Sequence, residues 1–204
     1  MQLSFSHLER VLLDSFTQKT MNFKNIGSDV FIDERAFLKY PQLIEIGSHC
    51  AFDNGLHMTT KGQFGSYVHV GPYVSIIGGK NSLIIAKDFS TIAAGARLIC
   101  LGEEHLGNGL VGPTIPEEYK DDMVGGKIVL NRFSNILTNA VIFPGVTIGE
   151  GAVVGAGAVL GMNAEPWSIY LGNPARKIKS RNKEKMRMLG NKLMKQMGSK
   201  VVSI

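Results

Sequence analysis

Aliphatic residues recur at an interval of six along most of the chain. The interval is clearest in the C-terminal half, where the repeated residues are Leu130, Ile136, Ile142, Ile148, Val154 and Leu160. A residue that is usually small stands four places after each of them, as Ala152 does after Ile148. An α-helix repeats every 3.6 residues and a strand every two, so neither element alone explains a period of six.

A coil made of three short, flat strands does explain this period. Each hexad forms one side of the coil, with its aliphatic side chain inside and its small residue at the corner. Successive coils stack at the inter-strand spacing of roughly 4.8 Å. One hexad cannot bury its own side chain, so many coils must stack to close a core. The pattern therefore predicts an all-β fold, a parallel β-helix of triangular cross-section; a sandwich would instead show period-two alternation with hairpin signals.

Hexads fill a main domain that we place at residues 21–175. They begin near Ile26, shift by two residues after Ile44, and end before Pro166. One segment inside this domain, 101–127, has no hexads, contains two prolines and is too long for an ordinary connection. We expect it to be an excursion loop that leaves the prism.

Helical patterns flank the main domain. In residues 1–20, Ser6 and Glu9 have the spacing of a capping box before a short amphipathic helix. The tail, residues 176–204, is expected to be helical from about 183 to 197. The apolar residues near one face of that helix are Met186, Leu189, Leu193 and Met197.

Charge is distributed unevenly between the body and the tail. The tail holds ten Lys and Arg against one acid, whereas residues 1–175 hold twelve bases and sixteen acids. The tail is therefore +9 and the body −4, which fits either a polyanion-binding tail or a solvated basic helix. We expect no nucleic acid partner.

Composition and the N-terminal sequence indicate in which compartment the protein is expected. The 24 glycines fit a chain with many tight turns. The two cysteines do not form a CxxC pair, so a disulfide scaffold and a thiolate zinc site are both disfavoured and a reducing compartment fits. The N-terminus lacks the features of a signal peptide, and no apolar run could span a bilayer. We expect a cytoplasmic protein without stable membrane insertion.

Several motifs carry a resemblance to a known family. The hexads, the segment PGVTIGEGAVVGAGAV and the closing GNPARKIKSR resemble the left-handed β-helix, hexapeptide-repeat acyltransferases. The order VHVGPYVSIIGG, LIIAKDFSTIAAGARLI, GPTIPEEY and PWSIYLGNPA is similar to a bacterial branch of dTDP-4-amino-4,6-dideoxyglucose acetyltransferases, which also includes polysaccharide O-acetyltransferases. The left-handed sense of the coil comes from this resemblance.

The resemblance also implies an activity and an assembly. The expected reaction is acetyl transfer from acetyl-CoA to the amine of a nucleotide-linked amino sugar, for surface polysaccharide such as O-antigen. The expected assembly is a homotrimer, with active sites in the grooves between neighbouring prisms.

Histidine is the natural general base for such a transfer near neutral pH. The five histidines are His7, His49, His57, His69 and His105. We set aside His7, which lies in the expected N-terminal helix, and expect His49 and His57 to face solvent. The resemblance favours His69. His105, at the start of the excursion loop, resembles the base of the galactoside and maltose acetyltransferases.

Spacing suggests that the two remaining histidines share one groove. One coil takes about 18 residues, so His105 would lie two coils beyond His69 on the same face, roughly 10 Å away. In the amino-sugar branch an acidic pair occupies this loop, and Glu103 and Glu104 match it as expected substrate-binding residues. No cluster with metal-ligand spacing surrounds the two histidines, and we expect no metal site.

The resemblance marks the cofactor end of the site as well. Thr138, Ala156 and Gly161 match positions that contact pantetheine in the family. Arg176 and Lys179 match basic residues that approach the phosphates of coenzyme A, a task suited to point charges.

Three other functions remain open on the sequence. The first is O-acetylation of a sugar or polysaccharide hydroxyl. The second is a γ-carbonic anhydrase-like enzyme, which would need three histidines at one zinc ion. The third is a non-catalytic structural trimer.

Overall fold

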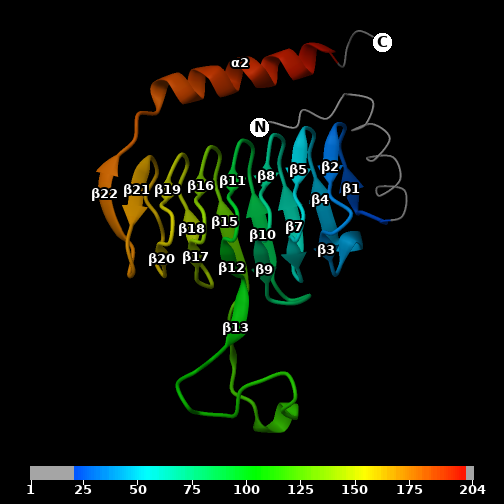
Figure 1. The fold of residues 1–204 in the computed structure, drawn as a ribbon, viewed down its shortest axis with the longest axis vertical. Helices are drawn as coiled ribbons and strands as arrows, with labels where there is room; N and C mark the ends of the chain where they lie inside the picture. Colours follow the sequence, from blue (N-terminus) through cyan, green and yellow to red (C-terminus); the bar gives the residue numbers. More distant parts are fainter. Residues whose placement is uncertain (1–20, 201–204) are drawn as a thin grey trace.

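The computed structural model describes residues 21–200, with side chains as far as residue 196. The chain winds into coils that stack as a triangular prism, coloured from blue to orange along its length in Figure 1. The helix expected within residues 1–20, together with His7, lies outside the described residues.

Three sheets form the sides of the prism, and all their strands pair in parallel except the last, β22. Sheet A consists of β1 (Asn25–Ile26), β4 (Ile44–Ile46), β7 (Lys61–Phe64), β10 (Leu83–Ala86), β15 (Lys127–Leu130) and β18 (Thr147–Ile148). Sheet B consists of β2 (Val30–Ile32), β5 (Cys50–Phe52), β8 (His69–Val70), β11 (Thr91–Ile92), β16 (Asn135–Ile136), β19 (Val153–Val154), β21 (Ser168–Leu171) and β22 (Arg176–Ser180). Sheet C consists of β3 (Phe37–Leu38), β6 (His57–Met58), β9 (Ser75–Ile77), β12 (Arg97–Ile99), β17 (Val141–Ile142) and β20 (Val159–Leu160).

The predicted hexad register is confirmed by the core. Ile136, Ile148 and Val154 are fully buried, as are the small corner residues Ala152 and Ala158. Backbone hydrogen bonds join each coil to the next. The inward side chains of the three sheets meet in a narrow core at the centre of the coils. We name the corners of the prism by the sheets they join: AB, BC and CA.

The residues at corner AB have an unusual, left-handed backbone conformation. Residues with positive φ occupy this corner in coil after coil, and they are Asp29, His49, Tyr67, Phe89, Phe133 and Trp167. Such a φ strains residues other than glycine. Stacking offsets the strain, because the ring centroids of Tyr67 and Phe89 lie 5.2 Å apart and those of Phe89 and Phe133 5.1 Å apart.

Helix α2 (Glu184–Lys200) lies along this corner (Figure 1). Its buried Gly190 packs so closely that a Cβ there would approach the Phe133 ring to 2.5 Å. Arg187 also pairs with Glu150, and this guanidinium holds the pKa of the Glu150 carboxyl below its ordinary value. The aromatic corner and the helix therefore support each other.

The tail differs from the prediction in two respects. Residues 176–180, for which no element was predicted, form strand β22, which pairs antiparallel with β21. The inner face of α2 is centred on Gly190, whereas Leu189 and Leu193 are 49% and 37% exposed. The prediction was wrong for these two leucines, because a glycine gives the closest contact with a flat aromatic corner, whereas Met186 is half-buried.

The excursion leaves the prism at corner CA, after β12. Strands β13 (Leu101–Glu103) and β14 (Met123–Gly125) pair antiparallel at its base, and a short 3₁₀ helix, η2 (Glu117–Tyr119), lies farther out. Figure 1 shows the segment projecting away from the prism on the side opposite α2. A second 3₁₀ helix, η1 (Pro41–Leu43), precedes β4.

The hexad register can be tested with one substitution and its matched control. Val154→Asp places an unpaired carboxylate in the core, and we expect it to lower the free energy of unfolding by about 3 kcal/mol or more. Thr147→Asp, on the outward face of sheet A, is expected to melt within a few degrees of the parent. Chemical denaturation and thermal melting measure both, and equal stability of the two variants would contradict the register.

Candidate functional site

His69 points outward from β8 and is held by a carboxylate from the preceding coil. Its Nε2 lies 2.9 Å from Oδ2 of Asp53, which directly follows β5. When Nε2–H donates to this carboxylate, the lone pair of Nδ1 stays available to take a proton. About half of the imidazole is exposed. Sequence reasoning missed Asp53, and only the stacking of the two coils shows the pairing.

The predicted proximity of His69 and His105 is wrong. His69 pairs in register with Thr91, and Thr91 pairs with Asn135, so Asn135 is the residue two coils beyond His69. His105 lies in the excursion, which leaves the opposite side of the prism at corner CA. The 18-residue spacing failed because one coil contains an added turn before β10 and the next contains the whole excursion.

The remaining histidines lie elsewhere. His57 is exposed on β6, as predicted, and stacks on Phe37 with ring centroids 4.9 Å apart. His49 is only half-buried at corner AB, where its Nδ1 lies 2.7 Å from Asp29 Oδ2. The structure therefore places the described histidines on different sides of one prism.

The two loop carboxylates have different surroundings. Both carboxylate oxygens of Glu103 accept a hydrogen bond from the backbone N–H of Gly112, at 2.8 and 2.9 Å. Glu103 therefore holds the shape of the excursion rather than offering a free carboxylate. The carboxylate of Glu104 has no partner within residues 21–200, and Glu104 remains a predicted substrate-binding residue.

The residues predicted to hold pantetheine lie at the two edges of sheet C. Thr138 and Ala156 are exposed at corner BC on consecutive coils, and the N–H of Gly157 donates to the Thr138 carbonyl at 2.9 Å. Gly161 lies at corner CA, beside the ring of Phe143. The backbone N–H groups of Thr138, Ala156 and Gly161 donate to no other described residue. Such exposed donors are suited to the amide carbonyls of a ligand.

The two predicted phosphate-binding residues lie on exposed strand β22. Arg176 pairs with Leu171, whose side chain covers Gly155 beside Ala156. Arg176 therefore lies at corner BC, near Thr138 and Ala156, whereas Gly161 lies at the other edge of sheet C. Lys179 pairs with Ile169, farther along the strand towards corner AB.

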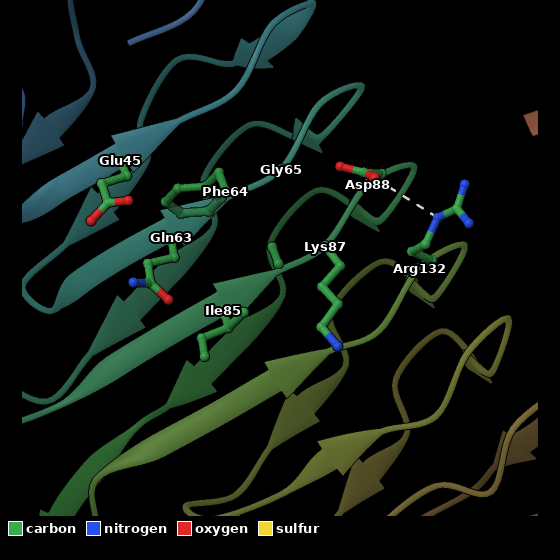
Figure 2. Close-up of a pocket in the computed structure, with 9 residues that line it drawn as sticks. Glu45, Gln63, Phe64, Gly65, Ile85, Lys87, Asp88 and Arg132 are labelled. Atoms are coloured by element: carbon green, nitrogen blue, oxygen red, sulfur yellow. Dashed lines mark ion pairs between the residues drawn. The ribbon is translucent and has the colours of Figure 1, made fainter. Parts of the chain in front are cut away.

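A shallow groove of about 390 Å³ lies on sheet A and contains none of the predicted site residues (Figure 2). Its lining includes Gln63 and Ile85 on the sheet and a charged cluster at corner AB. In that cluster Asp88 Oδ1 accepts from Ser66 N at 2.9 Å, and Oδ2 lies 3.8 Å from Arg132 Nε. The groove and the predicted site are thus on different faces.

Other chemistries have little to support them in the described part of the chain. No group of three or more His, Cys, Asp and Glu side chains there could hold a metal ion. Burial raises the pKa of the Cys100 thiol to about 12 and also raises that of Cys50, so neither offers a ready thiolate. Within residues 21–200, no helix is long and apolar enough to cross a membrane.

Comparison with known proteins gives a consistent result. No family model matches the chain. The dTDP-4-amino-4,6-dideoxy-D-glucose acyltransferase of Escherichia coli is 28% identical over 177 residues, covering 84% of this chain and 90% of that protein. A probable macrolide acetyltransferase of Lysinibacillus sphaericus is 37% identical over 130 residues, covering 56% of this chain and 68% of that protein.

Solved structures are similar over nearly the whole chain. A variant of AntD, an N-acyltransferase from Bacillus cereus, in complex with dTDP-4-amino-4,6-dideoxyglucose and coenzyme A, superposes with a TM-score of 0.83 at 35% identity, covering 89% of this chain and 96% of that one. AntD in complex with dTDP and 3-hydroxybutyryl-CoA gives a TM-score of 0.84 at 35% identity, covering 90% and 96%. These likenesses confirm the predicted left-handed parallel β-helix with a C-terminal helix, and the predicted acyltransferase activity with an acyl-CoA donor.

The role predicted for His69 can be tested by kinetics. A base acts in the chemical step, so we expect His69→Asn to lower kcat by roughly 10²–10⁴-fold with little change in the KM for acyl-CoA. Asp53→Asn should lower kcat less, because it changes the orientation of the ring without removing it. His105→Asn is expected to raise the acceptor KM more than it lowers kcat. Unchanged kcat in both histidine variants would mean that the amine attacks without a protein base.

Proposed function

Because the chain belongs to the left-handed β-helix, hexapeptide-repeat acyltransferases related to the dTDP-4-amino-4,6-dideoxyglucose N-acyltransferases, we propose that it N-acylates a nucleotide-linked 4-amino sugar. The leading acceptor is dTDP-4-amino-4,6-dideoxyglucose and the leading donor is acetyl-CoA. The observation that carries the proposal is the 35% identity to AntD over 89% of this chain, since AntD structures contain this amino sugar and coenzyme A.

The reaction follows from the chemistry of the two substrates. The neutral amine nitrogen attacks the thioester carbonyl carbon, the carbon–sulfur bond breaks, and an amide forms. The proton lost by the amine passes to a base, for which we propose His69, and the thiolate of coenzyme A takes up a proton as it leaves. Exposed backbone N–H groups near the carbonyl would stabilise its oxyanion in the transition state.

Coenzyme A is proposed to lie along the later coils of sheet C. Exposed N–H groups at Thr138, Ala156 and Gly161 would bind the amide carbonyls of the pantetheine arm. Arg176 and Lys179 on β22 would bind its phosphates, to which two cations provide charge-assisted hydrogen bonds. Small side chains at these positions let the arm approach the backbone.

The outward faces of the prism favour a particular trimer. Sheet A carries the charged residues Glu45, Lys61 and Lys127 on its outward face, whereas the outward rows of sheets B and C are mostly apolar or uncharged. We place corner BC towards the threefold axis, so that sheet B of one subunit faces sheet C of the next. His69 of one subunit would then face the cofactor groove of its neighbour.

The excursion loop supports the same arrangement. It is ordered as a hairpin at its base, yet Leu106, Leu110 and Tyr119 are 80%, 58% and 59% exposed. Apolar side chains projecting from a single prism find cover on a neighbouring subunit. The loop would thus close the groove from corner CA and bring Glu104 and His105 to it.

The cellular role is proposed from the resemblance noted in the sequence. We place the enzyme in the cytoplasm, where it would prepare an amino sugar for a surface polysaccharide such as O-antigen.

The reaction can be identified by mass spectrometry of products. We expect acetyl-CoA and dTDP-4-amino-4,6-dideoxyglucose to give a product heavier by one acetyl group that resists mild base, as an amide does. UDP- and GDP-linked amino sugars serve as matched acceptors, and 3-hydroxybutyryl-CoA as a matched donor. A product that loses its acetyl group in mild base would be an ester and would establish O-acetylation instead. Absence of product with every acceptor would refute the proposal.

The assembly can be tested independently of activity. We expect light scattering to give three times the 22.2 kDa mass of the chain at working concentration. Leu110→Asp should weaken the trimer, whereas the same change at the exposed helix residue Met188 should leave it intact. A fully active monomer would contradict a site shared between subunits.

A further inference from the structure

The outward face of sheet C carries a row whose chemistry changes along the prism axis. In register order the row is Phe37, His57, Ser75, Arg97, Val141 and Val159. Neighbouring strands lie roughly 4.8 Å apart, so the first four residues span about 14 Å. We call the first four residues, which are aromatic or polar, the polar half of the row, and the last two, which are aliphatic, the aliphatic half.

The aliphatic half coincides with the proposed position of coenzyme A. Val141 and Val159 lie on β17 and β20, with Thr138 at one edge of the sheet and Gly161 at the other. A pantetheine arm lying there brings its thioester to the boundary between Val141 and Arg97. The excursion leaves the prism from β12, at this same boundary, so the acyl group would meet the polar half of the row under the loop.

An aromatic platform forms the far end of the polar half. Phe37 is 50% exposed on the terminal strand of sheet C, and its ring stacks on His57 with an interplanar angle of 19°. An exposed phenylalanine stacked on an imidazole offers a surface on which a nucleobase can pack.

Two lysines gather on the ring of Tyr40, a residue that follows the terminal strand β3 of sheet C. Lys39 Nζ lies 5.6 Å and Lys80 Nζ 5.3 Å from the centroid of the Tyr40 ring. Neither lysine forms an ion pair with a residue of the described chain. A bound anion such as a diphosphate would supply the charged partner that both ammonium groups lack.

The near end of the polar half suits an amine. The Ser75 hydroxyl can accept a hydrogen bond from it. The exposed guanidinium of Arg97 lies on the next strand, where its positive charge disfavours the ammonium form. A neutral amine is the form that attacks a thioester.

We propose that this row is the acceptor site, with the nucleobase on Phe37 and His57, the diphosphate on Lys39 and Lys80, and the sugar amine at Ser75 and Arg97. The inference rests on the proposed function for its ligand class, a nucleoside diphosphate sugar. It assigns the acceptor to the coils before the excursion and the acyl donor to the coils after it.

Isothermal titration with dTDP tests the nucleotide end without any turnover. We expect the double variant Lys39→Ala/Lys80→Ala to weaken dTDP binding by roughly 10-fold or more, because it removes two charge-assisted contacts. The matched control, Lys61→Ala/Lys127→Ala on sheet A, removes the same charge and should bind as the parent does. Equal loss in both double variants would show a non-specific charge effect and would overturn the assignment. So would an unchanged affinity in the Lys39/Lys80 variant.

A second titration separates the two ends of the nucleotide. Phe37→Ala should weaken binding of dTDP but not of inorganic pyrophosphate, whereas the Lys39/Lys80 variant should weaken both. Loss of both ligands in Phe37→Ala, with normal thermal melting, would overturn the platform.

Steady-state kinetics then tests the amine end. Ser75→Ala and Arg97→Gln are expected to lower kcat/KM for the acceptor by roughly 10-fold or more while the KM for acetyl-CoA stays within about twofold of the parent. An increase confined to the KM for acetyl-CoA would move the donor to this half of the row and overturn the inference. If the parent makes no amide product, the proposed function fails, but the dTDP titrations still decide whether the row binds a nucleotide.

Discussion

Hydrogen bonding between successive coils is the constraint on which the rest of this structure depends. Each strand is only a few residues long and could not persist alone, and each aliphatic side chain is buried only by the coils above and below it. Because the coils are in register, a side chain that points outward on one coil lies beside an outward side chain on the next. Rows of surface chemistry are therefore a direct product of the core.

The corners show how the same register accommodates strain. At corner AB the turn takes a left-handed conformation in coil after coil, and in most coils an aromatic residue or histidine occupies it. Stacking makes this tolerable, and α2 covers the resulting flat surface through Gly190, where any larger residue would clash with Phe133. The basic tail is thereby fixed along one corner, leaving the outward faces of sheets B and C open to other contacts.

A single prism distributes its candidate catalytic groups among separate faces. His69 and Asp53 lie on sheet B, the aliphatic row and the nearby exposed backbone donors lie on sheet C and its edges, and the excursion projects from corner CA. A triangular prism cannot enclose a substrate by itself. The proposed trimer solves this problem by turning two different faces of neighbouring copies towards one groove, which the loop then covers.

The sequence alone determined the fold, because a period of six residues specifies which side chains enter the core and only a three-sided coil satisfies it. It also located the excursion, since prolines and missing hexads are visible without coordinates, and its motifs indicated the family. Tertiary structure decided which residues of different coils are neighbours. An added turn before β10 and the excursion itself upset the count of residues per coil, which separated His105 from His69. The contact of Asp53 with His69 and that of Lys80 with the Tyr40 ring arise only because coils distant in sequence stack on one another. Spacing along a chain cannot reveal such contacts when the coils differ in length.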